Sequence, residues 1–304
     1  MTDWTADTSD FDKGATNQSP APIRIGSDAH KTLFCRTLLE TFNPYRPAVI
    51  DWPNLDDDAR QRLVSLPIWD IAVQTEGKAS LRVKSYAQKV SGDELLRKAI
   101  ELNAFEEARH KHVLSNLVQA YGIELTPEPE YLPPRDPEWA FMVTGYSECI
   151  DSFFAFGLFE LARRSGYFPT ELVETFEPVM QEEGRHILFF VNWVAWRRRN
   201  MPIWKKLLFQ TRIAAVWVFL VWERLGLASS LGDDAEQDNN FTVTGAKTVG
   251  MDIGIAELVD ICLAEHDRRL RLYDGRLLRP RTVTFMITLA RRFMRSRGST
   301  PTPA

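Results

Sequence analysis

Two pentapeptides with the pattern Glu-Glu-x-Arg-His stand 76 residues apart in the chain, at Glu106–His110 and Glu182–His186. In each, the second glutamate precedes the histidine by three positions, which places a carboxylate and an imidazole on one face of a helix. Such ligands suit iron, with manganese as an alternative. The chain has only five histidines, so finding two of them in a duplicated motif indicates a pair of metal-ligating elements.

The segments around these motifs show a second regularity. Apolar residues recur at alternating intervals of four and three over 67–91, 93–121, 138–165 and 170–199, as expected for one buried face of each helix. Each apolar stripe is interrupted near its middle by polar residues. The first and third segments carry one glutamate and the others a Glu-x-x-His pair, so the candidate ligands are Glu76, Glu107, His110, Glu148, Glu183 and His186.

Four carboxylates that face the core of a helical bundle need compensating charge, because an unpaired buried charge is strongly destabilising. No lysine or arginine occupies the same central positions of the four stripes. Two divalent cations would supply four positive charges and balance the four carboxylates. The pattern therefore predicts a carboxylate-bridged dinuclear metal site.

This ligand set resembles that of the ferritin-like di-iron carboxylate superfamily, in which single glutamates on two helices join Glu-x-x-His pairs on two others. The resemblance covers about residues 67–199. The lone glutamate precedes its Glu-x-x-His pair by 31 residues in the first half and by 35 in the second, similar to the oxygenase and ribonucleotide reductase small-subunit branches. The resemblance implies an outer set of acids, each holding the histidine of the opposite motif, and arginines that brace them: Glu106, Arg109, Glu182 and Arg185.

Neighbouring acids compete for the ligand positions. In each motif the first glutamate could replace the second, but only the second lies three residues before the histidine. Glu160 competes with Glu148, but only 23 residues separate it from Glu183, too few for one helix, a turn and most of another. Glu148 is therefore favoured, and Glu177, beside Pro178, is expected to be solvated.

Several other side chains have two open interpretations. Ser152 stands one turn after the third-segment ligand, where its hydroxyl would assist oxygen activation or its small size would make room. His266 could add a seventh ligand, as in the related p-aminobenzoate N-oxygenases, although a helix-surface or capping position is favoured. His112 is expected at the surface, and Tyr86 and Tyr146 are expected in the core rather than in a redox role.

Proline, glycine and polar residues divide the chain. The Pro-rich stretch 126–137 separates two helix pairs, and Pro178 is expected to kink the fourth helix. Three further helix-like segments follow at 203–230, 248–274 and 281–297, the last of which is basic and amphipathic. An acidic loop at 232–240 separates the first two. The predicted fold is all-α, a ferritin-like four-helix bundle with additional C-terminal helices, comprising a disordered tail (1–28), an N-terminal extension (29–66), the bundle (67–200), accessory helices (201–297) and a disordered tail (298–304).

Composition excludes several classes of protein. The net charge is −4 and the basic residues are spread along the chain, so no nucleic-acid partner is expected. Cys35, Cys149 and Cys262 form no C-x-x-C pair, which excludes a zinc ribbon and fits a reducing, cytoplasmic location. The apolar run 213–222 is half the roughly 20 residues that a membrane span needs.

The resemblance implies a di-iron, oxygen-dependent oxygenase or oxidase that hydroxylates or N-oxygenates an apolar or aromatic small molecule, which could be lipid-linked. The cofactor would be two Fe ions or a Mn/Fe pair, with molecular oxygen as co-substrate. A reductase or ferredoxin would supply electrons. The alternatives are a ferritin-like iron-storage or ferroxidase protein and a tRNA-modifying hydroxylase; the length of 304 residues and the absence of a basic patch favour the small-molecule enzyme.

Aromatic side chains add two expectations. Some phenylalanines near the ligand positions would belong to the core and others would line an apolar pocket: Phe153, Phe154, Phe156, Phe159, Phe189 and Phe190. Trp217, Trp222 and segment 281–297 could pack the extra helices onto the bundle, form a homodimer contact or touch a membrane surface, and the peripheral membrane contact is the least favoured of the three.

Overall fold

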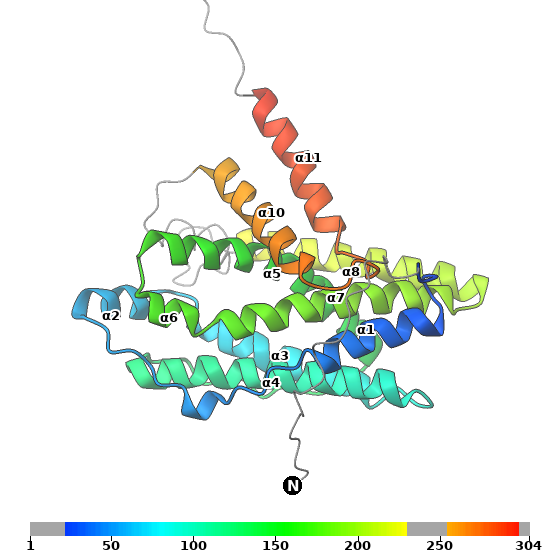
Figure 1. The fold of residues 1–304 in the computed structure, drawn as a ribbon, viewed down its shortest axis with the longest axis horizontal. Helices are drawn as coiled ribbons and strands as arrows, with labels where there is room; N and C mark the ends of the chain where they lie inside the picture. The colour runs from blue at the N-terminus through cyan, green and yellow to red at the C-terminus, as the bar shows by residue number, and fades with distance from the viewer. Residues whose placement is uncertain (1–21, 230–253, 298–304) are drawn as a thin grey trace, which may run out of the picture.

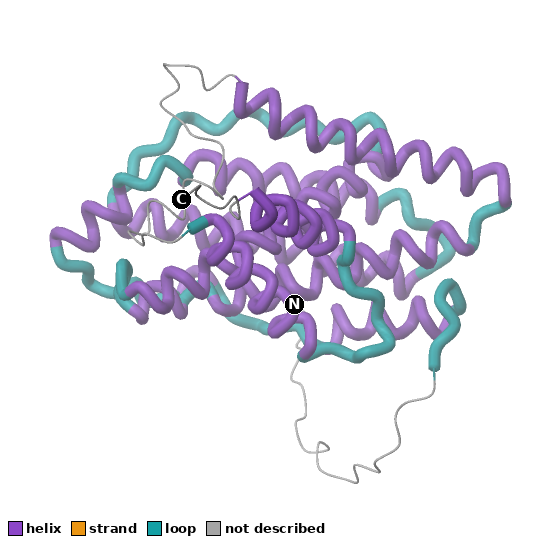
Figure 2. Tube along the Cα trace, turned by 90° about the horizontal axis from the view of Figure 1, so that it is seen from above, coloured by secondary structure: helices purple, strands orange, loops and turns teal. Residues whose placement is uncertain are grey.

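The computed structural model describes residues 22–229 and 254–297, in which every regular element is a helix and no strand occurs (Figures 1 and 2). This confirms the all-α prediction. The expected acidic loop at 232–240 and the tail at 298–304 lie outside the described residues, as does most of the tail at 1–28. No helix in the described part of the chain is long and apolar enough to cross a membrane.

Four long helices form the bundle: α3 (Trp69–Ala87), α4 (Glu94–Tyr121), α5 (Pro137–Ser165) and α7 (Glu177–Arg199). Local sequence fixes their ends. The side chains of Asp93 and Asp136 cap the first turns of α4 and α5 by accepting hydrogen bonds from backbone N–H groups. Both helices end at glycines in the left-handed conformation, Gly122 and Gly166. The bounds of α3, α4 and α5 therefore lie within a few residues of those predicted.

The expected single helix over 170–199 is wrong, because the chain forms a short α6 (Thr170–Glu174) and then α7. Pro178 lies in the first turn of α7. A proline is tolerated there because the first backbone N–H groups of a helix have no partner within it. Pro178 thus starts the helix rather than kinking it.

An N-terminal helix, α1 (Asp28–Glu40), lies against both α4 and α7, which make few direct contacts with each other (Figure 1). It buries Phe34, Cys35 and Leu38 in the main core. The chain then passes through the short η1 (Pro47–Val49), which contacts α4, and α2 (Asp57–Val64), whose Leu63 joins a smaller core at one end of the bundle. The N-terminal extension is therefore an integral part of the bundle.

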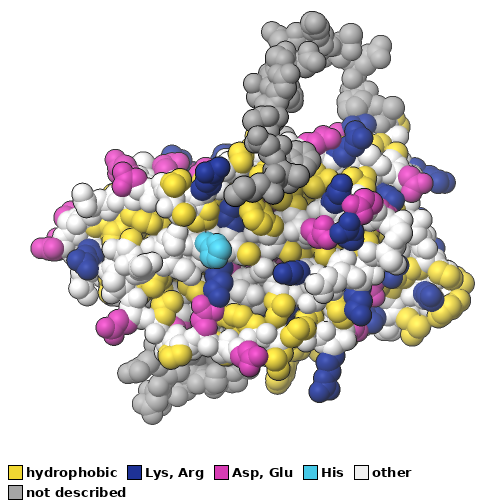
Figure 3. Space-filling view, turned by 90° about the horizontal axis from the view of Figure 1, so that it is seen from below, with side chains coloured by type: hydrophobic (Ala, Val, Ile, Leu, Met, Phe, Trp, Pro, Cys, Tyr) yellow, Lys and Arg dark blue, Asp and Glu magenta, His cyan; other side chains and the backbone are white. Residues whose placement is uncertain are grey.

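Three helices follow the bundle: α8 (Ile203–Ser229), α10 (Ile255–Arg271) and α11 (Thr282–Arg297). α8 packs on α5 and α7, and α10 packs mainly on α5. α11 contacts α5 and α10, with Arg291 paired to Asp260 of α10, and its C-terminal end projects away from the body (Figure 1). The face seen from below carries acidic and basic side chains dispersed among apolar ones (Figure 3).

The close approach of α10 to α5 depends on Gly157. A Cβ atom at this position would lie 2.9 Å from the backbone Cα of Cys262 and would also overlap its sulfur. Gly157→Ala is therefore expected to lower the free energy of unfolding by about 1–3 kcal/mol, as overpacking of a core does. The control is Gly184→Ala on α7, where the nearest atom lies at 3.9 Å and alanine should be tolerated. Equal urea midpoints for both variants would contradict the account.

Candidate metal centre

The bundle brings all six predicted ligands together at its centre. Glu76, Glu107, His110 and Glu183 form one group whose candidate ligand atoms lie within 4.8 Å of one another. A second group combines Glu107, Glu148 and His186. Since Glu107 belongs to both groups, the two sets of ligand atoms are adjacent, as a dinuclear site requires.

His110 is oriented by a carboxylate outside the ligand groups. Its Nε2 lies 2.8 Å from Glu182 Oε2, and because an ionised carboxylate only accepts hydrogen bonds, Nε2 carries the proton. In the neutral ring, Nδ1 then presents a lone pair. This atom faces Glu183 Oε1 at 3.3 Å and Glu76 Oε2 at 3.6 Å.

His186 repeats this arrangement with the partners exchanged. Its Nε2 donates to Glu106 Oε2 at 2.8 Å, and its Nδ1 lies 2.9 Å from Glu107 Oε1. The His110 and His186 rings are 5.7 Å apart between centroids. Both imidazoles therefore present Nδ1 to the centre of the bundle, each toward a ligand glutamate of the opposite motif.

Two arginines complete a buried network around the histidines. Arg109 bonds to Glu182, and Arg185 donates to Glu106 at 2.7 Å. Each acid thus holds the histidine and the arginine of the opposite motif, which is the crosswise arrangement that the resemblance implies. All four side chains are almost fully buried, so the network fixes both imidazole rings in position.

The N-terminal extension supplies outer contacts that the sequence analysis missed. Arg109 donates to the Asn43 carbonyl at 2.7 Å, and Arg185 donates to the Leu38 carbonyl at 3.0 Å. The Tyr45 hydroxyl lies 3.4 Å from Glu182 Oε2, and the Tyr45 ring stacks under the Arg109 guanidinium. Ser27, which caps α1, and the apolar spacing of 34, 35 and 38 are the sequence signals that point to a docked helix here.

The ligand atoms that lack a hydrogen-bond partner show whether metal ions fit this site. Four buried ligand atoms have no hydrogen-bond partner in the described part of the chain: Glu107 Oε1, His110 Nδ1, Glu148 Oε1 and His186 Nδ1. With Nε2 protonated, the lone pairs of His186 Nδ1 and Glu107 Oε1 face each other across 2.9 Å. Only a cation or a proton between them relieves this repulsion. The donor set fits two cations with oxygen and nitrogen ligands.

In the metal-free protein, protons take the place of cations. Burial raises the pKa of Glu148 well above its usual value, and the charges of Glu107 and Glu183 raise it further. Burial also raises the pKa of Glu76 to about 8, although His110 opposes the shift. Burial alone would lower the pKa of His186, but the Glu107 charge and the bond to Glu106 raise it well above its usual value. Metal binding must therefore displace protons.

These shifts predict how pH affects the metal-free protein. Because the pKa of Glu76 is raised to about 8, the folded state retains between about pH 6 and pH 8 a proton that this carboxylate has already lost in the unfolded chain. The raised pKa of Glu148 acts in the same direction. The folded state binds more protons than the unfolded one, so the free energy of unfolding should fall as pH rises over this interval. Urea unfolding at both pH values measures it. The variant Glu76→Gln/Glu148→Gln should have a weaker dependence, and a wild-type protein that gains stability toward pH 8 would contradict the account.

The competing acids lie outside the centre. Glu160 is buried but accepts hydrogen bonds from Arg163 and Arg164 on its own helix. The expectation that Glu177 is solvated is wrong, because it forms a bidentate pair with Arg269 of α10 at 2.8 and 2.9 Å. Glu177 therefore connects α7 to α10, whereas Glu160 pairs within α5, and neither acid belongs to a ligand group.

His266 also belongs to neither ligand group, and the favoured surface or capping position is wrong. Its ring is buried against Phe153 and Phe156, and burial lowers its pKa to about 4. Its neutral imidazole is thus part of the packing between α10 and α5. His112 is exposed, as expected.

The other aromatic candidates mainly pack the core. Tyr86 stacks on Phe141 with 4.7 Å between centroids, and Tyr146 contacts Trp217 of α8. Four of the six phenylalanines near the centre are almost fully buried: Phe153, Phe156, Phe189 and Phe190. The other two, Phe154 and Phe159, are partly exposed. The centre is thus set in aromatic surroundings.

Ser152 contacts the ligand groups directly. Its hydroxyl donates to Glu183 Oε2 at 3.0 Å. The serine is buried on α5, one turn after Glu148. Its contact therefore restrains the Glu183 carboxylate.

Of the comparisons with known proteins, the one with solved structures identifies related folds. No protein-family profile matches the sequence, and no curated protein matches it either. An R2-like ligand-binding oxidase with an aerobically reconstituted metal cofactor after photoconversion superposes with a TM-score of 0.51 at 15% identity, over 81% of this chain and 93% of that one. A Tyr-to-Phe variant with an anaerobically reconstituted Mn/Fe cofactor gives 0.51 at 16% identity, over 82% and 94%. The chain thus shares its helical, ferritin-like fold with these R2-like ligand-binding oxidases.

Proposed function

We propose that this protein is an oxygen-dependent oxidase or oxygenase with a dinuclear cofactor of two Fe ions or a Mn/Fe pair. The observation that carries the proposal is a set of four buried ligand atoms that have no hydrogen-bond partner among the described residues and whose residues belong to the two adjacent ligand groups. The R2-like ligand-binding oxidases that share the fold carry metal cofactors, Mn/Fe in the variant compared above. The six candidate ligands would hold the ions, and Glu107 would contact both.

The bound metals would supply the redox chemistry that activates molecular oxygen. The chain's own residues have separate tasks. Glu106 and Glu182 keep the proton on Nε2 of each histidine, so Nδ1 remains available as a ligand. Ser152 orients the Glu183 carboxylate. Buried phenylalanines surround the ligands on α5 and α7, while Glu76 and Glu183 keep 21% and 13% of their side-chain surface exposed.

The same surroundings support an apolar or aromatic small molecule as the substrate. Aromatic side chains dominate the part of α5 and α7 that flanks the ligands, and apolar walls favour apolar ligands. A hydroxylation or N-oxygenation would need electrons from a reductase or ferredoxin. The three cysteines are free and buried, which supports a reducing, cytoplasmic setting.

Exposure of the ferrous-loaded protein to oxygen tests this function. We expect anaerobic protein to bind about two ferrous ions per chain and, on mixing with oxygen, to consume oxygen and develop a transient visible absorption band. The variant Glu107→Ala should neither consume oxygen nor develop the absorption band. Uptake of tens of iron ions per chain would instead support storage and contradict an oxidase.

A further inference from the structure

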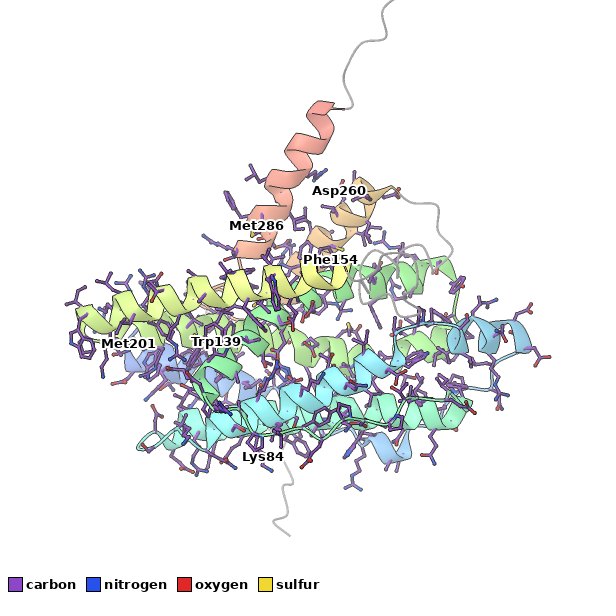
Figure 4. All side chains as sticks on the ribbon, turned by 180° about the vertical axis from the view of Figure 1, so that it is seen from behind. Lys84, Trp139, Phe154, Met201, Asp260 and Met286 are labelled. Atoms are coloured by element: carbon purple, nitrogen blue, oxygen red, sulfur yellow. The ribbon has the colours of Figure 1, made fainter. Side chains whose placement is uncertain are left out.

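Helix α8 presents an apolar face that no described residue covers. Trp204 and Leu208 lie on this face near the start of the helix, and Val218 and Trp222 lie on it near the end; each of these four is at least 58% exposed. The exposed small residues Thr211 and Ala215 separate the two pairs on the same face. Ile203 and Leu207 extend the face at its N-terminal end, at 75% and 68% exposure. α8 lies along the upper edge of the bundle in Figure 4, where Met201 marks the loop before it.

The opposite face of α8 is equally apolar and accounts for its attachment to the bundle. Phe209, Val216 and Leu220 are at most 2% exposed and pack in the main core. A helix that is apolar on all sides normally has a second apolar environment available to it. The outer face therefore requires a further apolar partner, because α5 and α7 cover only the inner face.

The charged residues near this face indicate the kind of surface that it contacts. No aspartate or glutamate occurs between Glu183 and Glu223, whereas Arg197–Arg199, Lys205, Lys206 and Arg212 lie in this interval. Arg197 and Arg212 pair with Glu138 and Asp136. No salt bridge within 22–229 and 254–297 involves the remaining four: Arg198, Arg199, Lys205 and Lys206. Two of these cations, Lys205 and Lys206, belong to α8 itself, and Lys205 Nζ lies 5.0 Å from the centre of the exposed Trp204 ring. Exposed apolar side chains beside cations without a carboxylate partner complement the surface of an anionic bilayer.

We infer that α8 docks this protein on anionic lipid membranes. The helix would lie in the plane of the interface, with Ile203, Trp204, Leu207 and Leu208 inserted among the acyl chains and with Lys205 and Lys206 of the same helix near lipid phosphates. A tryptophan near each end of the exposed face suits the headgroup region. The contact is peripheral, because α8 cannot span a bilayer. This inference is independent of the metal chemistry, since none of its residues belongs to the ligand groups.

Co-sedimentation of the full chain with vesicles tests the inference. The protein should bind vesicles of phosphatidylcholine and phosphatidylglycerol, bind those of phosphatidylcholine alone much more weakly, and dissociate as salt is raised. Trp204→Glu/Leu208→Glu should weaken binding about ten-fold or more. Lys205→Ala/Lys206→Ala should weaken binding to the anionic vesicles by about five-fold for each side chain removed.

The matched control is Val49→Glu/Leu132→Glu, which introduces the same charges at sites that are 74% and 75% exposed and lie off α8. It should bind vesicles like the wild type. Equal loss in both double variants, or no binding of the wild type to anionic vesicles, would overturn the inference. A lipid-free wild-type dimer that Trp204→Glu/Leu208→Glu converts to a monomer would also overturn it, because a second copy would then cover the face.

Discussion

Glu107→Ala should lower the metal content from about two ions per chain to one or none. Glu107 is the one residue that belongs to both candidate ligand groups, and it is almost fully buried. Its removal deletes a ligand atom from each group and leaves His186 Nδ1 without its nearest carboxylate. Metal analysis after anaerobic loading and removal of unbound iron measures the effect.

Glu101→Ala on the same helix is the control, because Glu101 is solvent-exposed and pairs only with Arg97 among the described residues. That variant should keep both ions. Retention of both ions by Glu107→Ala would show that the ligand assignment is wrong.

Glu182→Ala should destabilise the metal-free protein by about 3–5 kcal/mol, the usual cost of leaving a buried charge without its partner. The change removes the carboxylate that holds both Arg109 and His110. These two side chains are at most 4% exposed, so water cannot replace the lost partner. Metal affinity should also fall about 10–100-fold, since the histidine loses its orienting group. Denaturant unfolding and metal titration measure the two effects separately.

Glu160→Ala is a matched control for Glu182→Ala. Glu160 is also buried, but its partners Arg163 and Arg164 are about half exposed and can be hydrated when the acid is removed. Its loss should cost about 1 kcal/mol or less. Similar losses of stability in the two variants would show that the crosswise network has no special importance.

The central part of the site could be predicted because its signals are local. A polar interruption in an apolar helical stripe marks a ligand position, and the duplicated motif relates the two halves before any tertiary contact is known. Helix ends were predictable for a similar reason, since the glycines at 122 and 166 stop helices through their own backbone conformation. Such features require only the residue and its near neighbours.

Features that depend on distant partners could not be predicted. Glu177 was expected to be solvated, but its partner Arg269 lies 92 residues away on α10. The role of Tyr45 depends on the docking of the N-terminal extension against Arg109 and Glu182. The exposed face of α8 was hidden for another reason, because a helix that is apolar on both faces has no periodicity to distinguish inside from outside.

The most direct test of the dinuclear centre is a crystal structure of the protein loaded anaerobically with ferrous iron, with anomalous scattering recorded at the iron edge. We expect two anomalous peaks per chain, about 3.5–4 Å apart. One should contact Glu76, Glu107, His110 and Glu183, and the other Glu107, Glu148 and His186. A single peak, or peaks that lie away from Glu107, would contradict the proposal of a dinuclear metal site.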